Sequence, residues 1–260
     1  MYKHHEETVK KMLEHLKTNE DILGILLTGS IAHGFETPES DVDIMIITTE
    51  ADYKQKVERG EVTYWNNDIC TYDDGYVDGK YISVSFMEKV AEMGSEPARF
   101  AFDGAVILYS KIKNLQGLIQ KITQYPVEKK ESNIKRFYAQ FEAWRWYSYE
   151  AFKHDNAYLL NHAVSNLILF GGRLILAYNE VLYPYHKWFL RILNEVKEKP
   201  ENIMALIDEL LTHKNQETID GFYECIRDFT EWDESGFNAS QFVMDSELNW
   251  MTGHTPVSDI

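Results

Sequence analysis

Two short segments in the first fifty residues carry side chains that suit phosphate chemistry. In the first, Gly29-Ser30 follows the apolar run Ile22–Thr28, and a glycine after a strand allows the backbone to approach phosphates closely. In the second, after a spacer of ten residues, Asp41 and Asp43 stand at positions i and i+2 of an expected strand, so both carboxylates project from one face. Magnesium accepts one or two carboxylates together with substrate phosphates. The two segments together predict a metal-assisted transfer of a phosphate-bearing group.

Each segment alone has an ordinary structural explanation, since Gly-Ser is a common turn and Asp-x-Asp is common on exposed strand faces. Asp41 and Asp43, however, open a strand whose other residues are apolar, and charges in such a strand need a compensating partner. The whole segment GSIAHGFETPESDVDI resembles the signature of the DNA polymerase β-like nucleotidyltransferase superfamily. The size of the chain and its helical second half are similar to those of the bacterial aminoglycoside nucleotidyltransferases.

The resemblance implies a third carboxylate on a later strand, flanked by apolar residues. The best match is Asp78, in the run Tyr76–Tyr81, although Gly79 stands where the family has an apolar residue. Asp78-Gly79 is also a good hairpin turn, so both interpretations stay open at this point. As the third carboxylate, Asp78 would bind metal together with Asp41 and Asp43, or accept the proton of the attacking hydroxyl.

The activity that the resemblance implies is a Mg2+-dependent transfer of a nucleoside monophosphate, AMP from ATP, to a hydroxyl of a small acceptor, with release of pyrophosphate. An aminoglycoside-type antibiotic is the acceptor that this resemblance suggests, and the protein would then confer antibiotic resistance. Two alternatives stay open: an antitoxin-type nucleotidyltransferase that modifies a protein, and a non-catalytic nucleotide-binding module on the same scaffold. The same fold also modifies lincosamide drugs and tRNA ends, and a fold alone does not choose among these acceptors.

The second half of the chain supplies two further candidates, Glu142 and Lys187. The helix expected around 137–152 mixes aromatic residues with Glu142 and Glu150, and aromatic faces beside carboxylates suit a polycationic sugar. The ordinary explanation for these aromatics is a helical core. The resemblance implies a general base from the helical half, for which Glu142 is the candidate, and a basic residue that binds the triphosphate, for which Lys187 is the candidate. A solvated lysine beside Trp188 is the alternative for Lys187.

The hydrophobic pattern of the chain predicts an α+β fold with two domains. Residues 1–114 combine strands with helices and are expected to form the nucleotidyltransferase head, a mixed β-sheet flanked by helices. Within this head, a further helix is expected at Pro97–Leu108. Residues 115–260 lack strand alternation and carry long helical patterns, so we interpret them as an all-helical, substrate-binding domain. The acceptor site is expected between the two domains.

Composition and charge disfavour several classes of protein. The 42 acidic residues exceed the 26 basic ones and give a formal charge of -16, which disfavours a long nucleic acid as partner and favours a small cationic acceptor. Cys70 and Cys225 lack metal-ligand spacing and do not indicate a disulfide scaffold. The charged start of the sequence has no apolar signal-peptide core, and no apolar run approaches the ~20 residues of a membrane span, so we expect a cytoplasmic protein.

Overall fold

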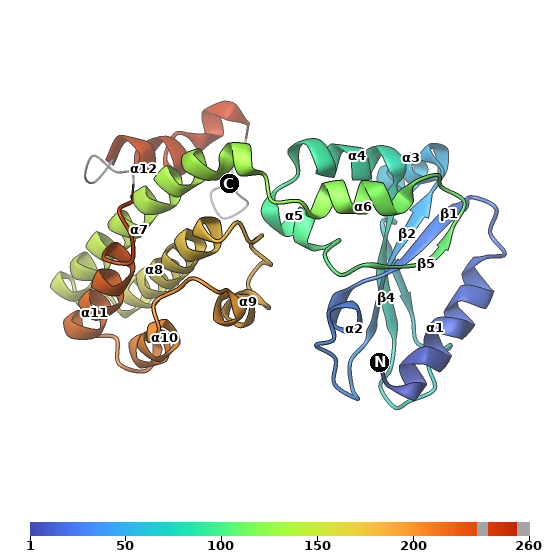
Figure 1. Ribbon diagram of the computed structural model, residues 1–260, viewed down its shortest axis with the longest axis horizontal. Helices are drawn as coiled ribbons and strands as arrows, with labels where there is room; N and C mark the ends of the chain where they lie inside the picture. The colour runs from blue at the N-terminus through green and yellow to red at the C-terminus, as the bar shows by residue number, and fades with distance from the viewer. Residues whose placement is uncertain (233–238, 254–260) are drawn as a thin grey trace. The chain divides into compact units, whose positions relative to one another are not determined.

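The computed structural model describes residues 1–232 and 239–253, and the chain divides into two compact units, Met1–Gln124 and Tyr125–Ile260 (Figure 1). The first unit mixes strands with helices and the second is helical where it is described, so the predicted α+β fold is confirmed. The boundary expected before residue 115 coincides instead with the start of helix α6 (Leu115–Thr123). This helix belongs to the first unit because its apolar side packs into that unit's core.

The first unit is built on one mixed sheet, whose strands follow the order β3-β4-β2-β1-β5. The strands are β1 (Ile22–Leu27), β2 (Val42–Thr48), β3 (Thr63–Asn66), β4 (Val77–Ser83) and β5 (Val106–Ser110). The pair β2 and β4 runs parallel, whereas the other neighbouring pairs are antiparallel. The strands expected at 22–28 and 41–48 are therefore confirmed as β1 and β2, and they lie side by side in the interior of the sheet.

Different helices cover the two faces of this sheet. The helices of the first unit are α1 (Lys3–Leu16), α2 (Gly29–His33), α3 (Glu50–Arg59), α4 (Val84–Met93), α5 (Glu96–Phe100) and α6. Because successive side chains of a strand point to opposite faces, Ile44 and Ile46 of β2 pack with α1, whereas Met45 and Ile47 pack with α4 and α6 (Figure 1). Asp43, two residues before Met45, therefore lies on the α4/α6 face.

The prediction of a helix at Pro97–Leu108 is wrong beyond the first helical turn. Helix α5 ends at Phe100, the chain turns at Gly104 with a φ of +67°, and β5 begins at Val106. The apolar run that suggested a continuing helix is instead an edge strand, paired antiparallel with β1. A short apolar run fits a strand as well as a helix until its pairing partner is known, which explains the error.

The second unit packs its helices around one large core. The elements described are η1 (Val127–Lys129), α7 (Lys130–Lys153), α8 (Ala157–Tyr178), α9 (Phe189–Glu195), α10 (Ile203–Thr212), α11 (Gln216–Arg227), α12 (Ala239–Ser246) and η2 (Asn249–Thr252). Several aromatics of α7, including Phe137 and Phe141, are buried in this core, so the ordinary explanation holds for them. Trp146 of the same helix is 53% exposed.

Helix α8 is long and apolar enough to cross a membrane by length and composition, but half of its most apolar window is buried within the protein. The buried helix of a protein core can have the same length and composition. The paired glycines of α8 have a packing role, because a Cβ at Gly171 would lie 2.9 Å from the Phe222 ring and one at Gly172 would lie 2.3 Å from the Phe189 ring. These aromatic rings therefore lie against the backbone of α8.

Candidate active site

The turn between β1 and α2 lies directly against Asp43. Gly29 adopts a φ of +63°, and a Cβ built on it would lie 1.8 Å from Oδ2 of Asp43. The backbone N–H of Thr28 donates to the carbonyl oxygen of Asp43 over 2.9 Å, which holds the turn in place. Position 29 therefore requires glycine for two reasons, the left-handed backbone and the lack of space for any side chain.

Ser30 offers a buried hydroxyl without a protein partner. The residue is 5% exposed, and its Oγ has no hydrogen-bond partner among the residues that the structure describes. Leaving a buried hydroxyl unsatisfied is unfavourable, and such a group often marks a ligand site. Helix α2 is only five residues long, so its N-terminus alone does not make an anion site.

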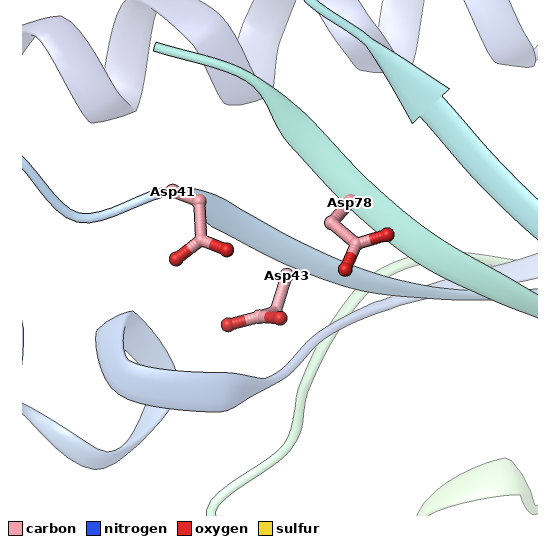
Figure 2. Close-up of side chains that lie close together, drawn as sticks. All are labelled: Asp41, Asp43 and Asp78. Atoms are coloured by element: carbon pink, nitrogen blue, oxygen red, sulfur yellow. The ribbon is translucent and has the colours of Figure 1, made fainter. Parts of the chain in front are cut away.

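Three carboxylates come together: Asp41 directly before β2, Asp43 in β2 and Asp78 in β4. One oxygen each from Asp41, Asp43 and Asp78 lies within 4.8 Å of the other two, and Figure 2 shows the three side chains gathered from the two neighbouring strands. Asp43 and Asp78 are direct partners in the parallel register, which places them on the same face. Three hard oxygen donors with like charge repel one another, so the arrangement suits a divalent cation such as Mg2+.

The position of Asp78 also decides the question of the hairpin. Asp78 and Gly79 lie inside β4 rather than in a turn, so the hairpin interpretation is wrong. A Cβ on Gly79 would lie 2.7 Å from the carbonyl oxygen of Ile44 on the neighbouring strand. The close approach of β2 explains why glycine occupies a place where an apolar residue was expected. Oδ1 of Asp78 accepts the Gly79 N–H over 2.7 Å and is held by that bond.

Three further residues share the face of the carboxylates and were not predicted from the sequence. Trp65 of β3 is the register partner of Asp78, and Lys80 follows Asp78 by two residues on β4. Tyr76 precedes Asp78 by two residues, and the Asp41 carboxylate raises the pKa of its hydroxyl. Burial lowers the pKa of the Lys80 ammonium although much of the residue is accessible to solvent, and the Asp43 carboxylate opposes that shift. Side chains two positions apart in a strand share a face, so the spacing of Tyr76, Asp78 and Lys80 could have identified Tyr76 and Lys80 as neighbours of Asp78.

Glu142 belongs to the second unit, where it takes part in a polar network. The Tyr223 hydroxyl donates to Oε1 of Glu142 over 2.5 Å, and the guanidinium of Arg145 lies 3.8 Å from the centre of the Tyr223 ring. Burial, together with the Glu142 carboxylate, raises the pKa of Tyr223 to about 12. Arg145 also pairs with Asp220 over 2.7 Å. Glu142 thus has a structural partner whatever chemistry it performs.

Removal of this hydroxyl is expected to destabilise the helical unit. Tyr223→Phe should lower the free energy of unfolding by about 1.5–3 kcal/mol, because a hydrogen bond to a charged group is lost inside the protein. Urea unfolding of the full chain measures this change. Tyr158→Phe is the matched control, since Tyr158 is 79% exposed. Equal stability of the two variants would contradict the structural role of the Glu142–Tyr223 bond.

Lys187 also belongs to the second unit and is exposed. Its Nζ lies 5.2 Å from the centre of the Trp188 ring, as the alternative of a lysine beside this tryptophan implies. A role for Lys187 in triphosphate binding stays a prediction.

Part of the chain, including the clustered carboxylates, is similar to a known protein family. A family model described as a nucleotidyltransferase domain matches residues 9–143, just over half of the chain and all three clustered carboxylates. The chain belongs to this nucleotidyltransferase family. No curated protein sequence matches this nucleotidyltransferase. Among solved structures, it is similar to a nucleotidyltransferase-like protein from Exiguobacterium sibiricum 255-15, at 13% identity and a TM-score of 0.47 over 86% of this chain and 73% of that one.

Proposed function

We propose that this nucleotidyltransferase transfers AMP from ATP to a hydroxyl of a small acceptor, with release of pyrophosphate. The observation that carries the proposal is the contact between the Gly29-Ser30 turn and a cluster of three carboxylates, and the Ser30 hydroxyl has no partner among the described residues. Phosphoryl-transfer sites depend mainly on positioning and on charge stabilisation. The turn would position the phosphates, and the carboxylates, through a bound cation, would stabilise their charge. Among the acceptors of the wider superfamily, we favour an aminoglycoside-type antibiotic, since a chain with a net charge of -16 attracts polycations.

Each site residue of the first unit has a separate proposed role. Asp41, Asp43 and Asp78 would hold Mg2+, which when bound supplies positive charge for the phosphate oxygens. The Ser30 hydroxyl donates to a phosphate oxygen, and Gly29 leaves room for the phosphates beside Asp43. Oδ1 of Asp78 accepts the Gly79 N–H, so we assign to its other oxygen, Oδ2, the role of accepting the proton of the attacking hydroxyl.

The residues of the second unit have proposed roles that rest on the family resemblance. We assign substrate binding to this unit, triphosphate binding to Lys187 and an alternative general base to Glu142. Glu142→Gln keeps an oxygen that accepts the Tyr223 hydroxyl but cannot take a proton at neutral pH, so its rate of transfer distinguishes a base from a structural residue. Substrates other than antibiotics fit the same chemistry, and a protein acceptor is the second candidate. The complete set of three carboxylates favours catalysis over a non-catalytic nucleotide-binding module.

The direct test is a screen of the purified full chain for magnesium-dependent pyrophosphate release. Nucleoside triphosphates are combined with a panel of aminoglycosides, and mass spectrometry then looks for an acceptor that has gained a nucleoside monophosphate. A second arm tests a protein acceptor: ATP labelled at the α-phosphate is added together with candidate acceptor proteins, and any protein that has gained the label is detected. Release of pyrophosphate with neither product, or no magnesium-dependent release together with no labelled protein, would contradict the proposed transfer.

Magnesium-ATP is expected to raise the melting temperature of the chain, because a ligand that binds only the native state stabilises it. At a hundred times its Kd the stabilisation is about 2.7 kcal/mol. Ser30→Ala should weaken the affinity by about tenfold, the equivalent of one hydrogen bond to a charged group. It should not destabilise the ligand-free protein, since the Ser30 hydroxyl has no partner among the described residues.

Thermal melts with and without magnesium-ATP measure both effects. Ser83→Ala is the matched control in the same unit, because Ser83 is also buried but its Oγ accepts the N–H of Phe86 and caps α4. This variant should lose about 1 kcal/mol of stability and keep its shift with nucleotide. A full nucleotide shift in Ser30→Ala would show that the hydroxyl does not bind phosphate.

A further inference from the structure

The order of the strands places the carboxylates between two different surfaces. Gly29-Ser30 follows β1, which neighbours β2 on one side. On the other side of β2 lie β4, which carries Asp78, and then the edge strand β3, which carries Trp65. A line drawn across the sheet therefore passes from the glycine turn to the three carboxylates and then to Trp65.

Two aromatic side chains form an exposed pair on this far side. Trp65 is 62% exposed and Tyr76 is 36% exposed, and their rings stack with centres 6.4 Å apart and planes inclined by 29°. Both share the face of the carboxylates, because Trp65 is the register partner of Asp78 and Tyr76 precedes Asp78 by two residues. A single exposed aromatic side chain needs no explanation. Two stacked, exposed rings beside the three carboxylates favour a ligand-binding surface.

The geometry of the reaction indicates which substrate this surface faces. The attacking and leaving oxygens lie roughly in line, on opposite sides of the phosphorus that is transferred. If the Gly29-Ser30 turn holds the departing pyrophosphate, the attacking hydroxyl must approach from the side of β4 and β3. Trp65 and Tyr76 lie on that side, next to Asp78, the carboxylate that is proposed to accept the proton of the hydroxyl.

We propose that Trp65 and Tyr76 form the acceptor subsite of this nucleotidyltransferase, and that the subsite takes a ring-shaped molecule that carries positive charge. The proposal rests on the proposed function. Aromatic faces stack against the apolar face of a ring and attract cations, and the three neighbouring carboxylates strengthen the attraction. The subsite lies within the first unit, on the sheet that carries the carboxylates, and it would add to the substrate binding that we assign to the second unit.

The test compares Trp65→Ala with Trp65→Phe in the full chain. Because the Trp65 side chain is largely exposed, neither change should affect folding. Trp250→Ala is the matched control, since Trp250 is 61% exposed and lies in η2 of the second unit. Calorimetry measures the affinity of each protein for three probes: tobramycin as a cationic ring, spermidine as a cation without a ring, and a magnesium complex of a non-hydrolysable ATP analogue.

We expect Trp65→Ala to weaken tobramycin binding by about tenfold, whereas Trp65→Phe and Trp250→Ala stay within about threefold of the native protein. Spermidine should bind more weakly than tobramycin and respond less to Trp65→Ala, and the affinity for the nucleotide should not change. Unchanged tobramycin affinity in Trp65→Ala, or no tobramycin binding by the native chain, would overturn the subsite while nucleotide binding still upholds the proposed function. A parallel loss of nucleotide affinity in Trp65→Ala would overturn it by assigning the pair to the nucleobase. Failure of the native chain to bind the nucleotide would contradict the proposed function itself.

Discussion

Asp43→Asn is expected to reduce nucleotidyl transfer by a factor on the order of a thousand while the protein stays folded. Asp43 is at the centre of the cluster, since it is the register partner of Asp78 and touches the Gly29 turn. Asparagine keeps the size of the side chain and removes one negative charge from the site that would hold the metal. The backbone of residue 43 keeps its hydrogen bond to Thr28, so the fold should persist.

The rate of pyrophosphate release at saturating magnesium and nucleotide measures this loss, and a thermal melt confirms that the variant is folded. Asp73→Asn makes the same chemical change on an exposed residue outside the cluster and should leave the rate unchanged. Turnover near that of the native enzyme in Asp43→Asn would mean that the cluster is not the catalytic centre.

The second large effect is expected from a single methyl group, in Gly29→Ala. A Cβ at this position would overlap Oδ2 of Asp43, so the carboxylate or the turn must move. A displacement of about 1 Å in a catalytic group can cost on the order of a hundredfold in rate. The left-handed backbone, with a φ of +63°, adds a strain of roughly 1–2 kcal/mol for any residue other than glycine.

Gly60→Ala separates the strain from the collision. Gly60 has a φ of +71°, but among the described residues, its two chain neighbours aside, no atom lies within 4 Å of the Cβ that alanine would add. The two variants should lose similar stability from the backbone, whereas only Gly29→Ala should lose activity and nucleotide binding. Kinetics and urea unfolding on both proteins provide the comparison. If Gly29→Ala is as active as Gly60→Ala, the contact between the turn and Asp43 has no catalytic importance.

The parts of the site that were predicted are those that local pattern determines. Asp41 and Asp43 share a face because strand side chains alternate, and the Gly29-Ser30 turn follows a strand that reads as one from its apolar run. Asp78 was harder to place, because its status depends on the pairing of β4 with β2, between residues far apart in the sequence. The same pairing explains Gly79, whose reason for being glycine is the backbone of Ile44.

What escaped prediction depends on tertiary register and packing. Trp65 acquires a place beside the carboxylates only because β3 pairs with β4 so that it stands opposite Asp78. The strand β5 was interpreted as part of a helix, since nothing local shows that it pairs with β1. Tyr223 was not linked to Glu142, because α11 and α7 are separated by α8 and the other helices of the second unit. In each case the missing information was the identity of a distant partner.

The parallel pairing of β2 with β4 also determines when the site can form as the chain folds. The Gly29 turn and Asp43 meet through β1 and β2, which are neighbours in both sequence and space. Asp78 joins them only after the crossover through α3 and β3 has closed, and closing a longer loop costs more chain entropy and slows folding. Before that closure, Asp41, Asp43 and the Gly29-Ser30 turn are brought together by β1 and β2 alone. We therefore expect the cluster of three carboxylates to be completed late in folding, when β4 pairs with β2.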